Sequence, residues 1–253
     1  MEGEAIAGMG LFMGKLLQII LVNIVLSGDN AVVIALACRN LPPHQRKIGI
    51  LLGTGVAIGL RIIFYLMIAW LSGVPFLKLI GALLLLWIAV KLVMGEDESG
   101  HEVSASDQLW RAVQTIAIAD AVMSLDNVLA IVGVARDDTV LALLGLAISI
   151  PLIVVGASLI TTLINRFPVL IWIGAGLLGW VAGEMLVDDP VILNWLNANA
   201  PQYVHPKPND PAGIGLEPIA VLHYGAAALG VLFVLVVGFV MARNAGRGAA
   251  KTT

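Results

Sequence analysis

One stretch of the sequence reads Asn23-Ile24-Val25-Leu26-Ser27-Gly28-Asp29-Asn30-Ala31-Val32. A similar stretch follows 97 residues later and reads Asp120-Ala121-Val122-Met123-Ser124-Leu125-Asp126-Asn127-Val128-Leu129. A second pair of similar segments keeps the same order. Ile80 to Ala89 recurs 93 residues later as Ile173 to Ala182, with a tryptophan at the same place in both. Two matching pairs in one order indicate an internal duplication.

The composition restricts the class of protein. The chain has 253 residues, of which 59% are hydrophobic and 12% charged, whereas soluble proteins have roughly 25% charged residues and about 45–50% apolar ones. The high apolar content excludes a disordered chain. The net charge of −3 and the scattered basic residues exclude nucleic-acid binding. A single cysteine, Cys38, excludes a disulfide framework and a cysteine-rich metal site. These values predict a helical protein that crosses a membrane several times.

Seven segments are long and apolar enough to cross a bilayer as helices, which takes about 20 residues each. They are 12–37, 47–71, 76–94, 109–134, 138–163, 168–187 and 219–242. Each copy of the duplicated unit contains three spans. Because three is odd, the second copy must enter the membrane from the opposite side, as in the inverted repeats of many secondary transporters.

We therefore expect an all-α membrane protein with two inverted three-helix repeats and one extra C-terminal helix. The expected organisation is a first repeat at 1–94, an acidic inner loop at 95–108 and a second repeat at 109–187. It continues with an irregular outer loop at 188–218, rich in Pro, Asn and Asp, and ends with a seventh helix and basic tail at 219–253.

The basic residues give the orientation. Of the 14 Lys and Arg residues, Arg61 falls within a span; with the N-terminus outside, nine of the others lie on the inner side and four on the outer side. Lys and Arg are enriched in cytoplasmic loops. The expected location is therefore the inner (plasma) membrane, with the N-terminus outside and the C-terminus in the cytoplasm.

Four carboxylates lie within predicted spans: Asp29, Asp120, Asp126 and Glu184. Each costs about 2.5–3.5 kcal/mol at the centre of a bilayer. Such residues usually face a cavity and take part in transport or proton transfer. Arg61, in the second span, is interpreted as a structural counter-ion for them.

Helical spacing predicts which of these polar groups lie together. In a helix, a residue shares one face with the residues four and seven positions further along. One such stripe contains Asn23, Ser27 and Asn30. The other contains Asp120, Ser124 and Asn127. Asp29 and Asp126 lie roughly 120° away from these stripes. We therefore expect a local break in both helices, at Ser27-Gly28-Asp29 and at Ser124-Leu125-Asp126, because Ser, Asp and Asn compete for backbone hydrogen bonds.

The polar groups all offer oxygen, which suits Mg²⁺, Ca²⁺ and Mn²⁺ better than copper or zinc. The candidate metal ligands are Asp29, Asn30, Asp120, Asp126, Asn127, Glu184, Asn23, Ser27 and Ser124. Two other interpretations stay open. The two Ser-x-Asp-Asn motifs can cap the ends of broken helices, and Glu184 can be an interfacial carboxylate that points outward.

The paired segments Asn23 to Val33 and Asp120 to Ile131, each with Ser-x-Asp-Asn, resemble the TerC family of integral membrane proteins. The resemblance extends over the first six spans. It implies an exporter of metal ions, since bacterial members are implicated in manganese export and in tellurite resistance. It also implies that Asp29 and Asn30 in the first motif, and Asp120, Asp126 and Asn127 in the second, are ligands. The first repeat has Asn23 where the second has Asp120, so the two halves differ in charge.

Together, these features predict a secondary transporter, not an enzyme, that exports Mn²⁺, with Ca²⁺ as the alternative substrate, through a carboxylate-rich site near the midplane. The expected coupling is exchange with protons. No organic cofactor is expected, and no Gly-rich phosphate loop is present for ATP. The alternatives are an assembly or metal-stress factor without transport, and the same fold carrying Ca²⁺, another cation or an amino acid. An intramembrane aspartyl protease is disfavoured because Leu26-Ser27-Gly28 precedes Asp29 where such enzymes have Gly-x-Gly.

Overall fold

The computed structural model describes residues 9, 12–22, 28–71, 74–94, 105–135, 139–208, 210 and 214–249. In chain order, the elements are a helix at Phe12–Val22, α2 (Gly28–Cys38), α3 (Pro43–Leu71), α4 (Leu77–Met94), α5 (Ala105–Ala135), α6 (Thr139–Arg166), α7 (Val169–Val187), α8 (Pro190–Asn199), the 3-10 helix η1 (Pro201–Tyr203), β1 (Val204–Pro206), β2 (Leu216–Pro218) and α9 (Ala220–Ala249).

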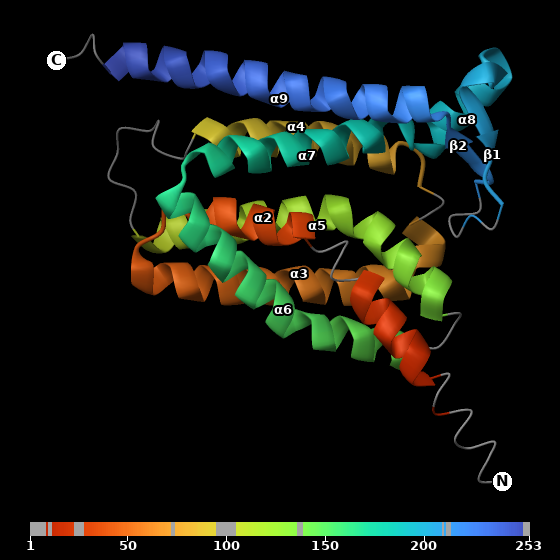
Figure 1. The fold of residues 1–253 in the computed structure, drawn as a ribbon, viewed down its shortest axis with the longest axis horizontal. Coiled ribbons are helices and arrows are strands. Elements are labelled where there is room, and N and C mark those ends of the chain that lie inside the picture. Colours follow the sequence, from red (N-terminus) through yellow and green to blue (C-terminus); the bar gives the residue numbers. More distant parts are fainter. Residues whose placement is uncertain are drawn as a thin grey trace.

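The long helices form two layers (Figure 1). One layer consists of α4, α7 and α9, and the other of α2, α3, α5 and α6, with every helix in contact with the others of its layer. The layers meet where α4 packs on α5 and where α2 packs on α7. The largest group of buried apolar side chains lies along this seam, with contributions from α2, α4, α5 and α7.

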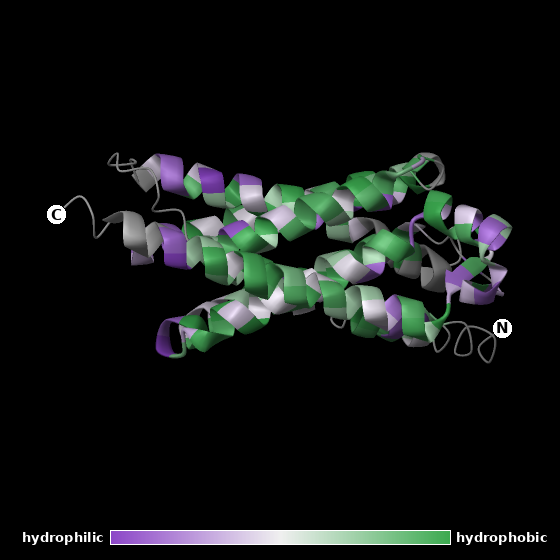
Figure 2. Ribbon diagram, turned by 90° about the horizontal axis from the view of Figure 1, so that it is seen from above, coloured by the Kyte–Doolittle hydropathy of each residue, from purple (hydrophilic) through white to green (hydrophobic). Residues whose placement is uncertain are grey.

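Within the described part of the chain, five helices are long and apolar enough to cross a membrane, and they lie in α3, α4, α6, α7 and α9. Figure 2 shows the hydrophobic residues in the middle of the bundle and the hydrophilic ones mainly at its two ends. Many large apolar side chains, such as Leu66, Trp87 and Leu229, are exposed on the outer surface of the bundle. An apolar band between polar ends is the surface that a bilayer covers, so the chain is an all-α membrane protein.

Six of the seven predicted spans correspond to continuous helices, namely α3, α4, α5, α6, α7 and α9. In the first span, the described residues form two shorter helices, Phe12–Val22 and α2, and residues 23–27 lie outside the described part of the chain. The two helices run in different directions in Figure 1. Of the predicted break at Ser27-Gly28-Asp29, Gly28 and Asp29 belong to the first turn of α2, and Ser27 lies outside the described residues. Of the predicted acidic loop, residues 95–104 lie outside the described residues, while 105–108 belong to α5.

The prediction of an irregular segment at 188–218 is wrong for its described residues, which form α8, η1 and a small antiparallel sheet. The buried carboxylate of Asp189 explains the order at the start of this segment. Its Oδ1 accepts a hydrogen bond from the Val191 amide (2.9 Å) and caps α8, while its Oδ2 accepts one from the Leu79 amide (3.1 Å) at the start of α4. One aspartate thus satisfies the free amides of two helices.

Glycines allow α7 and α9 to approach closely. A Cβ atom placed on Gly179 would lie 2.6 Å from the carbonyl oxygen of Gly230, and one on Gly230 would collide with the backbone of Gly179. Small residues have this role at helix interfaces in membranes, where close backbone contact drives association. On the same helix, a Cβ atom at Gly176 would meet only side-chain atoms at 3.6 Å and beyond.

Alanine at these two glycines of α7 should therefore have opposite effects. Gly179→Ala is expected to lower the free energy of unfolding by about 1–3 kcal/mol, as overpacking typically does. Gly176→Ala should leave it unchanged or raise it, because alanine favours the helix more than glycine does. Thermal unfolding of the purified proteins in detergent measures both changes. Equal stability of the two variants would contradict the close approach of α7 and α9.

Candidate cation site between the two halves of the bundle

Helix α5 carries the second copy of the duplicated motif and is continuous from Ala105 to Ala135. The predicted break at Ser124-Leu125-Asp126 is therefore wrong. Two features explain the continuity. Leu125, a good helix former, stands where the first motif has Gly28. The Ser124 hydroxyl donates to the side chain of Asp120 (2.8 Å), so it does not compete for the backbone bonds of the helix.

The stripe predicted on α5 is confirmed. Asp120, Ser124 and Asn127 are all buried, with exposed fractions of 2%, 0% and 4%. Ser124 donates to Oδ2 of Asp120, and the buried Nδ2 of Asn127 has no hydrogen-bond partner within the described part of the chain. Buried polar atoms usually have partners, so this amide marks a place where a further group can bind.

The other oxygen of Asp120 forms a buried ion pair with Arg61 of α3. The guanidinium Nη2 lies 2.8 Å from Oδ1 of Asp120, and the two side chains are 1% and 3% exposed. This pairing agrees with the interpretation of Arg61 as a counter-ion. Removal of one member of a buried pair typically costs about 3–5 kcal/mol, because the other charge is left without compensation.

The first copy of the motif meets this pair through α2, which packs on α5. Asp29 lies in the first turn of α2, where its Oδ1 accepts a hydrogen bond from the amide of Asn30 (2.7 Å). Asn30 is 2% exposed, whereas Asp29 is half-buried. The first motif thus lies on a helix that packs on the helix of Asp120.

Several predicted ligands fall outside this description. Asn23 and Ser27 lie outside the described residues, and the backbone of Asp126 belongs to α5 while its side chain is not described. Among the described residues, no group of three or more His, Cys, Asp and Glu residues is arranged to hold a metal ion. The described carboxylates at the site are Asp29 and Asp120, supplemented by the amides of Asn30 and Asn127 and the hydroxyl of Ser124.

Glu184 has its described partners elsewhere, on the side of α7 that faces α9. Its Oε1 accepts a hydrogen bond from Trp180 Nε1 (2.7 Å) and lies 3.2 Å from Nε2 of His223. The other imidazole nitrogen, Nδ1, lies 3.4 Å from Oδ1 of Asp188. We did not predict this cluster from the sequence. The signal for part of it is the spacing of Trp180 and Glu184, because side chains four residues apart are neighbours on the surface of a helix. The role of Glu184 as a metal ligand stays a prediction.

A polar cavity of about 360 Å³ adjoins this cluster at the beginning of α9. The lining residues are Asp188, His205, Lys207, Glu217, Pro218, Ala220, His223 and Tyr224.

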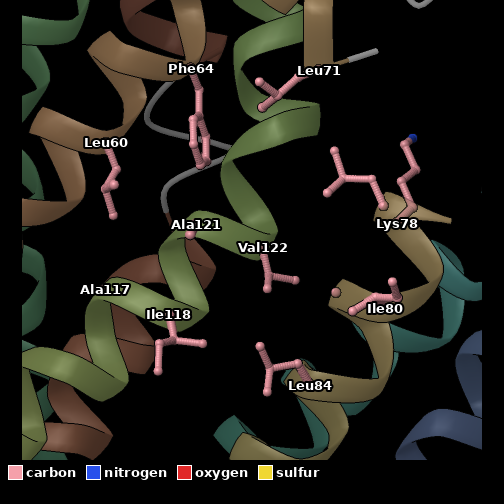
Figure 3. Close-up of a pocket in the computed structure, with 12 residues that line it drawn as sticks. Leu60, Phe64, Leu71, Lys78, Ile80, Leu84, Ala117, Ile118, Ala121 and Val122 are labelled. Atoms are coloured by element: carbon pink, nitrogen blue, oxygen red, sulfur yellow. The ribbon is translucent and has the colours of Figure 1, made fainter. Parts of the chain in front are cut away.

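A larger cavity, of about 450 Å³, lies among α3, α4 and α5. Figure 3 shows apolar side chains around it, with Phe64 from α3, Leu84 from α4 and Val122 from α5. Among the described residues that line it, Lys78 is the charged one, and none has a carboxylate or amide side chain. A cation prefers oxygen ligands, and the described side chains of this cavity offer none.

These features define a polytopic helical membrane protein with a buried ion pair, Arg61–Asp120, where its two halves meet. Comparison with known families agrees, because the model of the integral membrane protein TerC family matches residues 10–245. The chain belongs to the TerC family, as the two Ser-x-Asp-Asn segments had suggested.

Curated relatives share parts of the sequence. The uncharacterized membrane protein YjbE of Bacillus subtilis is 41% identical over 175 residues, which are 69% of this chain and 80% of that protein. Two Escherichia coli proteins of the group UPF0053, the inner membrane protein YoaE and YegH, are 29% and 27% identical over 62% of this chain. The matched regions span only about a third of those two proteins. No solved structure matches the chain.

The ion pair between α3 and α5 can be tested by a double-mutant cycle. Arg61→Gln and Asp120→Asn should each lower the free energy of unfolding by about 3–5 kcal/mol, since each leaves one buried charge uncompensated. The double variant should lose clearly less than the sum of the two, because it buries no charge. Ser124→Ala, which removes one hydrogen bond to Asp120, should cost about 1 kcal/mol. Unfolding in detergent measures all four variants, and additive losses would exclude the pair.

Proposed function

We propose that this protein is a secondary transporter that exports a divalent cation across the inner membrane, with Mn²⁺ as its best-fitting substrate and protons as the exchanged ion. One observation carries the proposal: Asp120 of the second half is buried in an ion pair with Arg61 of the first half, and α2, which has Asp29 in its first turn, packs on the same helix as Asp120. Carboxylates at bilayer depth are costly and mark ion pathways.

The packing of the helices supports an inverted repeat with seven spans, in which Phe12–Val22 and α2 together form the first. Exchanging α2 with α5, α3 with α6 and α4 with α7 reproduces the pattern of contacts. The packing of α3 on α5 corresponds to that of α6 on α2, and the packing of α4 on α5 corresponds to that of α7 on α2. A two-fold relation of this kind places a substrate site where the repeats meet, which is where Asp29 and Asp120 lie.

The proposed ligands are the carboxylates of Asp29, Asp120 and Asp126 and the side-chain oxygens of Asn30 and Asn127. Asn23, Ser27 and Ser124 are within the same motifs and complete the set of available oxygens. Such oxygen donors suit Mn²⁺ and Ca²⁺, and the family resemblance favours Mn²⁺. We propose Glu184 as a further ligand that needs its own test, because its described partners are Trp180 and His223.

Exchange with protons fits the energetics of export. Moving a dication outward against an inside-negative potential costs about 4.6 kcal/mol per 100 mV, twice the value for one charge. Two protons that move inward cancel this electrical cost. The orientation proposed from the basic residues places the N-terminus outside and the end of α9 in the cytoplasm. Figure 1 supports this, since Phe12–Val22 and the C-terminal end of α9 lie at opposite ends of the bundle.

The proposal predicts that inside-out vesicles containing the protein take up Mn²⁺ when their interior is acidic. Asp29→Asn and Asp126→Asn should each reduce the initial rate to that of vesicles without the protein, because each removes a charged ligand. Asp107→Asn is the matched control, since Asp107 is exposed in the first turn of α5. It should retain the wild-type rate. Glu184→Gln tests whether the cluster on α7 takes part.

A panel of Mn²⁺, Ca²⁺, Mg²⁺ and Zn²⁺ identifies the substrate in the same assay. A wild-type protein that is folded and oriented but moves none of them would refute transport and favour the role in assembly or metal stress. Uptake that is unchanged in both Asp variants would refute the proposed site while leaving transport in place.

A further inference from the structure

Arg61 has an unusual position for a structural counter-ion. It is among the largest fully buried side chains, and its guanidinium pairs with Asp120 across the boundary between the two halves. Asp120 is one of the carboxylates that the proposed function assigns to the cation. The positive charge of the protein therefore lies where the positive charge of the substrate must also bind.

The hydrogen bonds of Asp120 identify the oxygen atoms for which Arg61 and the transported cation would compete. Its Oδ1 accepts from Arg61 at 2.8 Å, and its Oδ2 accepts from Ser124 at 2.8 Å. Each oxygen accepts one hydrogen bond and still has a lone pair, so a metal ion that binds Asp120 would share this carboxylate with the Arg61 guanidinium. Two positive groups on one carboxylate repel strongly in a buried site.

We propose that Arg61 is a built-in competitor of the transported cation: it compensates Asp120 when the site is empty and must withdraw from Oδ1 when the cation binds. This inference rests on the proposed function and adds a residue that sets the affinity of the site. A buried site with several carboxylates would otherwise hold a dication too tightly to release it on the other side. The competing guanidinium lowers the affinity without removing a ligand.

A purely structural role leads to the opposite expectation. If Arg61 only holds α3 against α5, its loss loosens the site and weakens cation binding or leaves it unchanged. A competitor predicts that its loss strengthens binding. The sign of the change in Mn²⁺ affinity therefore separates the two roles.

The test is equilibrium binding of Mn²⁺ to the purified full-length protein in detergent, followed by electron paramagnetic resonance of the free ion. Arg61→Gln should lower the Kd by at least about tenfold, the order expected when one close buried charge is removed. Arg61→Lys keeps a charge on a shorter side chain without the planar fork, so its Kd should lie between those of the wild type and Arg61→Gln. Arg111→Gln removes a positive charge from an exposed site on α5 and should keep the wild-type Kd.

A second measurement responds to the guanidinium group itself. In Arg61→Ala, added methylguanidinium should raise the Kd of Mn²⁺ in a dose-dependent way, because it can occupy the vacated place on Asp120. The wild type should not respond. A folded Arg61→Gln protein that binds Mn²⁺ no more tightly than the wild type would overturn the inference. Where that variant is not recovered folded, an Arg61→Lys protein with the wild-type Kd would overturn it.

The outcomes distinguish a failure of the proposed function from a failure of the role proposed for Arg61. If the wild type neither binds Mn²⁺ nor transports any cation of the panel, the proposed function fails. If the wild type binds and transports Mn²⁺ while the Arg61 variants bind it with unchanged or lower affinity, only the role of Arg61 fails.

Discussion

A buried carboxylate in an apolar bundle must be compensated, and the Arg61–Asp120 pair meets this requirement at the centre of the molecule. The pair joins α3 to α5, which lie in different halves of the duplicated sequence. Burial of both side chains means that neither charge can rely on water. The contact between the two halves is thereby stabilised by a buried ion pair, and our proposal for Arg61 adds that a cation can replace the guanidinium as the partner of Asp120.

The rest of the bundle provides the frame for this interaction. Small residues let α7 and α9 approach until their backbones touch, and α4 completes a layer on which α2 and α5 rest. Outside the frame, Asp189 binds the first turns of α4 and α8 with its two oxygens. Close backbone packing in one layer thus accompanies a buried ion pair in the other.

The helices could be predicted from the sequence because the length of an apolar segment is a local property of the chain. The ends of α3, α4, α6 and α7 lie within a few residues of the predicted ends. The stripe of Asp120, Ser124 and Asn127 could also be predicted, because it follows from helical spacing alone. The break predicted in α5 was wrong because the tendency of Ser124 to compete for the backbone is removed by Asp120, a contact within the stripe. The partners of Glu184 were missed because His223 lies on a helix 39 residues further along the chain, and such a pairing depends on how α7 meets α9.

The two copies of the duplicated sequence are unequal in charge. The first motif begins with Asn23 and the second with Asp120; a turn beyond each duplicated tryptophan, the first repeat has Lys91 and the second has Glu184. Lys91 lies over the ring of Trp87, whereas Glu184 accepts a hydrogen bond from Trp180. The position one turn beyond the tryptophan thus carries a positive charge in one copy and a carboxyl group in the other. Identical copies would carry the same charged groups at corresponding positions, and these substitutions make the two halves of the bundle electrostatically unequal.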